Sequence, residues 1–310
     1  MSFFFNTYAS EHLRGGGLYA LYKVETGMYC QYSCYCGGIR TKVCENVYQI
    51  KIEFNVTKTI KRYVYCYLIM GKKCYFIDAG VNGCKKNLEV WLQKKGRKIQ
   101  EVEAIFLTHA HPDHIGGAAE IKEESNCKIY CSEIEKKWVE DIDLQFKERP
   151  IPNFYELVNK SVIVDKVVQD NDRLLLENGI TLRVIGAAGH SFGSVSYLWE
   201  EKGVLFSGDA IPNLNELPIL VDREKSRQTL ERFGKEKNIH ICCPAWDRVY
   251  AGAEVKEQMK ASQKYLEKLE TCIQKAKKIY GDNMENVAAA VCHELGFDLA
   301  MINPLFKRSI

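Results

Sequence analysis

The sequence contains no run of apolar residues long enough to cross a membrane. Its 310 residues are 46% hydrophobic, yet no apolar stretch approaches the roughly 18 residues that a membrane helix needs. Positive and negative charges are nearly balanced, since 43 Lys and Arg residues against 40 Asp and Glu residues give a formal net charge of +3. This balance favours neither a nucleic-acid partner nor a membrane surface. We therefore expect a soluble protein without these two partners.

Signals for export are lacking as well. Residues 1–10 include three consecutive phenylalanines, but neither the basic start nor the long apolar core of a secretory signal. The 13 cysteines are odd in number and scattered along the chain. Reduced thiols in a cytoplasmic protein are the simplest interpretation of that pattern.

Regular patterning is absent from the first forty-odd residues. This segment has glycine clusters at 15–17 and 37–38 and only weak hydrophobic periodicity. Its cysteines do not have the paired spacing of a structural zinc site. We predict that residues 1–42 form a disordered or poorly packed extension. Patterned sequence begins at Val43, and no linker interrupts residues 43–310, which we expect to form one domain that includes a C-terminal helical segment.

Against this background, residues 108–117 are dense in groups that bind metals. The stretch reads Thr-His-Ala-His-Pro-Asp-His-Ile-Gly-Gly and contains His109, His111, Asp113 and His114. It follows an apolar, strand-like run at 102–107, so the polar side chains lie on a loop that leaves a buried strand. Imidazole and carboxylate groups at this density suit a first-row divalent metal, and Zn²⁺ fits them best.

Three further polar residues follow predicted strands in the same way. Asp78 comes after the strand at 74–77, His190 follows a strand that ends near 185, and Asp209 follows one at 203–207. Strand ends on one edge of a sheet converge. We therefore expect these groups to meet the His loop around a metal, although they are far apart in the chain.

Four motifs in order resemble those of the metallo-β-lactamase superfamily, over about residues 45–250. They are Asp78-Ala79-Gly80, the His-x-His-x-Asp-His signature at 109–114, Gly-His-Ser-Phe-Gly-Ser at 189–194, and Ser207-Gly208-Asp209. The resemblance implies a mixed α/β fold, a four-layer αβ/βα sandwich with C-terminal helices and two metal sites at one edge.

Carried over position by position, the resemblance also implies ligands. His109, His111 and His190 would bind the first metal, Asp113 and His114 the second, and Asp209 would bridge the two. Asp78 would form a hydrogen bond with the His loop and orient it. The cofactor would be one or two Zn²⁺ ions, with Fe or Mn as alternatives. A metal-bound water would be the nucleophile, and Asp113 would take or pass its proton.

One element departs from the family pattern. The superfamily usually has a final ligand His after a late strand, where this chain has Trp246. An indole has no lone pair for a metal, since its N–H is only a donor. Asp247 is the candidate replacement ligand, and His240 and Cys243 are further alternatives. Trp246 and Phe192 are candidates for the wall of a substrate pocket.

This departure leaves three functions open. The first is a hydrolase that cleaves a thioester, lactone, amide or similar bond of a small molecule. The second is a mononuclear iron enzyme that oxidises a persulfide, with the iron held by His109, His190 and Asp209. The third is a metal-binding protein without catalysis. Residues 141–161 and the C-terminal Lys307 and Arg308 are candidates for substrate selection, and the Lys-rich helix near 253–279 for a homodimer seam.

Overall fold

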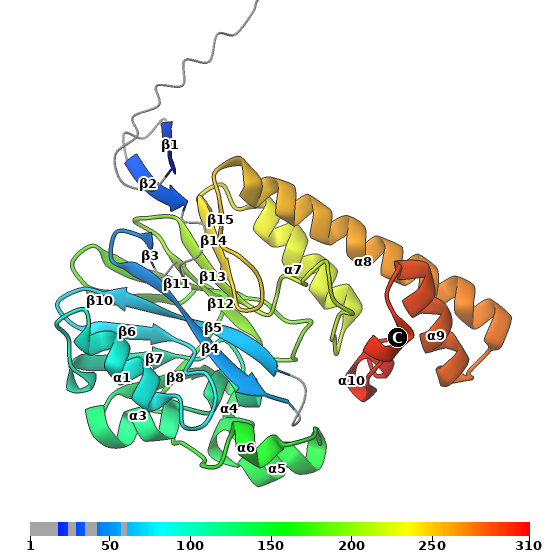
Figure 1. The fold of residues 1–310 in the computed structure, drawn as a ribbon, viewed down its shortest axis with the longest axis horizontal. Helices are drawn as coiled ribbons and strands as arrows, with labels where there is room; N and C mark the ends of the chain where they lie inside the picture. Colours follow the sequence, from blue (N-terminus) through cyan, green and yellow to red (C-terminus); the bar gives the residue numbers. More distant parts are fainter. Residues whose placement is uncertain (1–17, 24–28, 35–41, 57–60) are drawn as a thin grey trace, which may run out of the picture.

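Two β-sheets face each other, and helices cover both outer faces (Figure 1). The computed structural model describes residues 18–23, 29–34, 42–56 and 61–310. The first sheet has the order β3-β4-β5-β6-β7-β8-β9. Its strands are β3 (Lys42–Cys44), β4 (Val47–Asn55), β5 (Lys61–Met70), β6 (Cys74–Ile77), β7 (Val102–Phe106), β8 (Lys128–Ser132) and β9 (Lys166–Val168).

The second sheet follows the chain in the same simple way, with the order β10-β11-β12-β13-β14-β15. Its strands are β10 (Arg173–Glu177), β11 (Ile180–Gly186), β12 (Val195–Trp199), β13 (Val204–Gly208), β14 (Ile241–Pro244) and β15 (Tyr250–Ala251). The strands β6 and β13, which lead to Asp78 and Asp209, lie inside their sheets and are buried throughout, as expected when both faces of a sheet are covered.

The space between the sheets is filled by side chains from both. Tyr67 and Ile69 of β5 pack there with Tyr197 and Phe206 of the second sheet. Successive side chains of a strand point to opposite faces. Leu68 therefore faces away from the second sheet, into the core beneath the helices.

Two further cores bind the helices to the sheets. The helices on the first sheet are α1 (Lys85–Gln93), α2 (Pro112–Ile115), α3 (Ala118–Ser125), α4 (Glu133–Glu140), α5 (Ile142–Glu148) and α6 (Phe154–Leu157). Those on the second side are α7 (Arg223–Lys235), α8 (Ala253–Tyr280), α9 (Met284–Leu295) and α10 (Pro304–Lys307). Two 3₁₀ turns, η1 (Ile99–Glu101) and η2 (Leu299–Met301), complete the set. Three cores between four layers confirm the predicted αβ/βα sandwich.

Several observed elements differ from what the local sequence pattern predicts. The prolines and aromatic residues of 141–161 predict an irregular segment, but it contains α5 and α6. The Arg-Leu-Leu-Leu-Glu sequence of β10 has no alternation and does not predict a strand; β10 is a half-exposed strand at the edge of its sheet. The apolar residues of 162–168 predict a strand along the whole segment, but only Lys166–Val168 pairs with β8.

Part of the predicted N-terminal extension is described. Within it, β1 (Leu18–Lys23) and β2 (Tyr29–Cys34) pair antiparallel. The rest of the prediction for residues 1–42 falls outside the described residues, apart from Lys42, which begins β3. Along the described chain, no helix combines the length and the apolar character that crossing a membrane requires.

Candidate metal centre

Loops from both sheets meet at one edge of the sandwich. Asp78 follows β6, and the loop with His109 and His111 follows β7, its parallel neighbour in the first sheet. His190 lies between β11 and β12, and Asp209 follows β13 of the second sheet. The two sheets therefore supply the site jointly.

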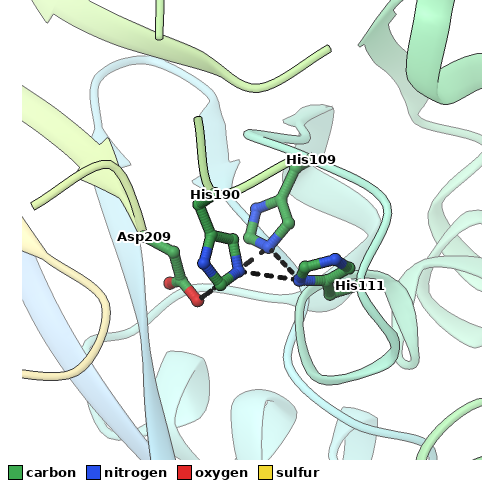
Figure 2. A group of neighbouring side chains, drawn as sticks. All are labelled: His109, His111, His190 and Asp209. Atoms are coloured by element: carbon green, nitrogen blue, oxygen red, sulfur yellow. Dashed lines mark hydrogen bonds and ion pairs between the residues drawn. The ribbon is translucent and has the colours of Figure 1, made fainter. Parts of the chain in front are cut away.

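Four of the predicted ligands converge on one point (Figure 2). Nδ1 of His111 lies 2.9 Å from Nε2 of His109 and 2.8 Å from Nε2 of His190. Oδ2 of Asp209 lies 3.1 Å from Nε2 of His190 and 3.9 Å from Nε2 of His109. One donor atom from each residue fits within 4.8 Å of all the others. Three imidazole nitrogens and one carboxylate oxygen in this arrangement are a donor set suited to a tetrahedral divalent metal.

Burial keeps these imidazoles in the form that binds a metal. It lowers the pKa of His109 and of His111 well below the ordinary value, and it lowers the pKa of His190 as well. Burial alone would raise the pKa of Asp209, but attraction from His114 and His190 outweighs it, and the pKa lies well below the usual range. Neutral imidazoles around an ionised carboxylate favour a cation between them.

A second group of donors adjoins the first. Nε2 of His114 lies 3.2 Å from Oδ1 of Asp209 and 3.5 Å from Oδ2 of Asp113. Both Nε2 of His114 and Oδ1 of Asp209 are buried, and neither has a hydrogen-bond partner among the described residues. Buried polar atoms without partners cost free energy. A second cation held by these two atoms would remove that cost. Asp209 thus offers one oxygen to each group.

Asp78 fixes the second group from behind. Its Oδ2 accepts a hydrogen bond from Nδ1 of His114 over 2.8 Å, which leaves Nε2 free to face the site. Its Oδ1 accepts one from the backbone N–H of Thr108 over 2.8 Å. Asp78 is 2% exposed and has a φ of 59°, a left-handed conformation uncommon outside glycine. The carboxylate is therefore held tightly in place at the end of β6.

Sequence reasoning did not identify Glu135, which connects the two ligand loops. Its Oε2 accepts from the N–H of Ala110 over 2.9 Å, and its Oε1 accepts from the N–H of Gly193 over 2.8 Å and from the hydroxyl of Ser191. The residue is 3% exposed, on the same face of α4 as the buried Val139. The only sequence signal for Glu135 is its position one helical turn before the apolar Val139, on the same face of the helix.

The predicted replacement ligand, Asp247, lies apart from these donors. Its Oδ1 accepts from the N–H of Arg248 over 2.7 Å, and its Oδ2 accepts from the hydroxyl of Tyr250 over 2.5 Å. Trp246 faces the site instead, and its indole N–H donates to Oδ2 of Asp209 over 3.0 Å. This geometry gives no support to Asp247 as a ligand. The alternative Cys243 is buried between the two sheets.

Phe192 also lies away from the donors. Its side chain is 56% exposed and lines a cavity of about 490 Å³ together with Ile134, Val168 and Arg232. None of the predicted metal ligands lines that cavity. The prediction that Phe192 forms a wall of the substrate pocket is therefore not supported, whereas Trp246 does contact the site through Asp209.

The fold and the donor set define a metalloprotein of one known class. Residues 59–241 match the family model of the metallo-beta-lactamase superfamily, and the chain belongs to that superfamily. A metallo-beta-lactamase family protein from Thermus thermophilus has the same fold, with a TM-score of 0.64 at 19% identity over 86% of this chain and 91% of that one.

Curated relatives share parts of the sequence. A probable metallo-hydrolase of Methanocaldococcus jannaschii is 28% identical over 62% of this chain and 89% of its own length. A probable metallo-hydrolase of Bacillus subtilis is 31% identical over 47% of this chain and 64% of its own length. A hydroxyacylglutathione hydrolase of Rhodopseudomonas palustris is 26% identical over 39% of this chain, and the match spans only 37% of that enzyme.

Proposed function

We propose that the protein is a metal-dependent hydrolase that cleaves a thioester or a related acyl bond of a small molecule. The observation that carries this proposal is the convergence of His109, His111, His190 and Asp209 within 4.8 Å. The names of the relatives support it, since they include metallo-hydrolases and a hydroxyacylglutathione hydrolase. A lactone or an amide remains an alternative substrate within the same chemistry.

The residues divide into two holding groups. His109, His111, His190 and Oδ2 of Asp209 would hold a first ion, for which we propose Zn²⁺, with Fe and Mn as alternatives. Asp113, His114 and Oδ1 of Asp209 would hold a second, more weakly. A divalent ion bound there polarises an acyl carbonyl and acidifies water.

Side chains of the protein hold a proton beside the metal site and orient the metal ligands. Burial raises the pKa of Asp113, so this carboxyl can hold a proton beside the reacting atoms more readily than an exposed one. Asp78 keeps Nδ1 of His114 occupied, and Trp246 donates to Asp209. These contacts fix both ligands before a substrate arrives.

Metal removal and addition test the proposal. The protein is stripped with EDTA, reloaded with Zn²⁺, Fe²⁺ or Mn²⁺, and assayed on a panel of thioesters, lactones and amides. We expect hydrolysis to vanish on stripping, to return with at least one metal, and to fall at least 100-fold in Asp209→Ala. The control His240→Ala changes an exposed histidine outside the site and is expected to behave like the wild type.

A second candidate, the iron persulfide dioxygenase, is favoured by one observation. The first group is complete, whereas the sequence has Trp246 at the position where the family pattern has the last ligand of the second group. Iron at one equivalent, with oxygen consumption on glutathione persulfide and no hydrolysis of the panel, would decide for that enzyme. Metal binding without either activity would decide for a protein that binds metal without catalysis.

A further inference from the structure

Two arginines near the metal centre differ from all others in the described chain. Eight arginines there form ion pairs with carboxylates: Arg62, Arg97, Arg173, Arg183, Arg223, Arg227, Arg232 and Arg248. Arg149 and Arg308 are the two described arginines whose guanidinium groups form neither an ion pair nor a hydrogen bond with the described residues. A guanidinium without a counter-ion is available to a ligand.

Arg149 is held against the His loop by the helix that precedes it. Gln145 of α5 is fully buried and donates from Nε2 to the backbone carbonyl of Ala110, between two metal-ligand histidines, over 2.5 Å. Arg149 lies one turn later, and its N–H donates to the carbonyl of Gln145 over 2.8 Å. Its charge acts on Asp113 and on His111, so the guanidinium lies within electrostatic reach of both metal groups.

Arg308 is an exposed residue at the end of α10, in the C-terminal segment. The next residue, Ser309, is buried, and its hydroxyl accepts a hydrogen bond from the N–H of Leu220 over 2.8 Å. The preceding carbonyl, that of Ile219, accepts from Nδ1 of His190 over 2.7 Å. The residue after Arg308 is therefore hydrogen-bonded to the loop that orients the metal ligand His190.

The two guanidiniums also act on each other. Burial lowers the pKa of Arg149 to about 10, Asp113 opposes this, and repulsion from Arg308 adds to it. Two like charges within electrostatic reach of each other, without a counter-ion among the described residues, repel each other. An anion between them would remove that repulsion, and the planar guanidinium fork binds the oxygens of a carboxylate or a phosphate in pairs.

We propose that Arg149 and Arg308 form a subsite for an oxyanion, a carboxylate or a phosphate, carried by the substrate whose acyl bond lies at the metal centre. This inference rests on the proposed hydrolase function and names the class of substrate. Lys307, the other C-terminal candidate, is paired with Glu285 over 2.6 Å and is not part of the subsite.

Three matched thioesters test the subsite: S-ethyl thioacetate, 3-(acetylthio)propionate and 2-(acetylthio)ethyl phosphate. We expect the metal-loaded enzyme to prefer at least one anionic ester over the neutral one by tenfold or more in kcat/KM. Arg149→Met and Arg308→Met should each reduce that preference about tenfold, the worth of a charged hydrogen bond. If the substitutions reduce the preference for 3-(acetylthio)propionate, the subsite binds a carboxylate; if they reduce the preference for 2-(acetylthio)ethyl phosphate, it binds a phosphate. Arg149→Lys should recover only part of it, because ammonium lacks the fork.

Controls change a nearby charge outside the subsite. Lys147→Met removes an exposed positive charge of α5, and Lys307→Met removes the positive charge of the residue before Arg308. Both are expected to keep the wild-type preference. Equal turnover of the neutral and anionic esters, or a preference that survives both arginine substitutions, would overturn the subsite.

A binding measurement separates this proposal from the proposed function. Calorimetry records the binding of succinate and of inorganic phosphate to the metal-loaded protein without turnover. If no thioester, lactone or amide of the panel is hydrolysed but the anions bind to the wild type at least tenfold more tightly than to the Arg149 and Arg308 variants, the hydrolase proposal fails and the subsite stands. Equal binding to wild type and variants overturns the subsite whatever the activity.

Discussion

The indole N–H of Trp246 donates a hydrogen bond over 3.0 Å to Oδ2 of Asp209, an oxygen that also lies 3.1 Å from Nε2 of His190. Trp246 therefore stands beside the carboxylate shared by the two donor groups, where its indole N–H can donate a hydrogen bond but cannot bind a metal. Around the indole, the guanidinium of Arg62 lies 5.0 Å from the ring centre, and the ring of Tyr63 lies 6.2 Å away. A packed aromatic side chain thus borders the carboxylate of Asp209.

Changing Trp246 to His should raise the number of metals held. We expect wild-type protein to keep one Zn²⁺ after dialysis, and Trp246→His to keep two, because the new imidazole adds a ligand to Asp113 and His114. Elemental analysis of the dialysed protein measures this. Trp246→Phe removes the N–H without adding a ligand and should still keep one. Two tightly held ions in the wild type would show that the second group needs no further ligand.

Removing the carboxylate of Glu135 should weaken the fold and the site together. Glu135→Ala leaves the N–H groups of Ala110 and Gly193 and the hydroxyl of Ser191 without their acceptor. We expect a loss of about 3 kcal/mol in the free energy of unfolding, measured in urea, and a weaker affinity for Zn²⁺. Glu133→Ala alters an exposed residue of the same helix and should cost far less. Equal losses in the two variants would contradict the role given to Glu135.

Acid should destabilise the metal-free protein below about pH 6.5, the ordinary pKa of an unfolded histidine. In the folded state the pKa values of His109, His111 and His190 are lowered, so the unfolded chain binds protons that the folded chain does not. The pKa values of His114 and Asp113 are raised and oppose this, but they are two groups against three. Urea unfolding in EDTA should give a smaller free energy at pH 5.5 than at pH 7.5. A constant or rising value would contradict the prediction.

Most cysteines should resist thiol reagents in the native protein. The ten cysteines whose side chains are described are all buried. Burial raises the pKa of Cys66, Cys131 and Cys243 well above the ordinary value, so these thiols stay protonated at pH 8. Ellman's reagent should therefore react quickly with at most three of the 13 thiols in the native protein, because ten are buried, and with all 13 in guanidinium. Rapid reaction of more than three would show that the core opens readily.

The sequence allowed the donor cluster to be predicted because each ligand lies in a short motif at a strand end. His109 and His111 are two residues apart, and the strand before them is apolar. The supporting residues could not be found in this way. Glu135 and Gln145 act through contacts with Ala110, which only the packing of α4 and α5 on the His loop creates.

Neighbouring positions in the sequence also proved a poor guide to neighbouring positions in space. Asp247 follows Trp246 directly, yet its carboxylate is bound to Tyr250 while the indole faces Asp209. Trp246 and Asp247 lie in a bend between β14 and β15, where their side chains point in different directions. A one-residue replacement of a lost ligand therefore needs a change of backbone, which sequence spacing does not reveal.

The division of the donors between the two sheets has a consequence for the order of folding. His109 and His111 belong to the first sheet, whereas His190 and Asp209 belong to the second, so all four converge only after the sheets have docked. An ion that needs all four binds the finished fold and not an early intermediate. We expect Zn²⁺ to slow unfolding and to leave the refolding rate unchanged, as stopped-flow measurements can record. The ion would then lengthen the lifetime of the native state without directing how that state forms.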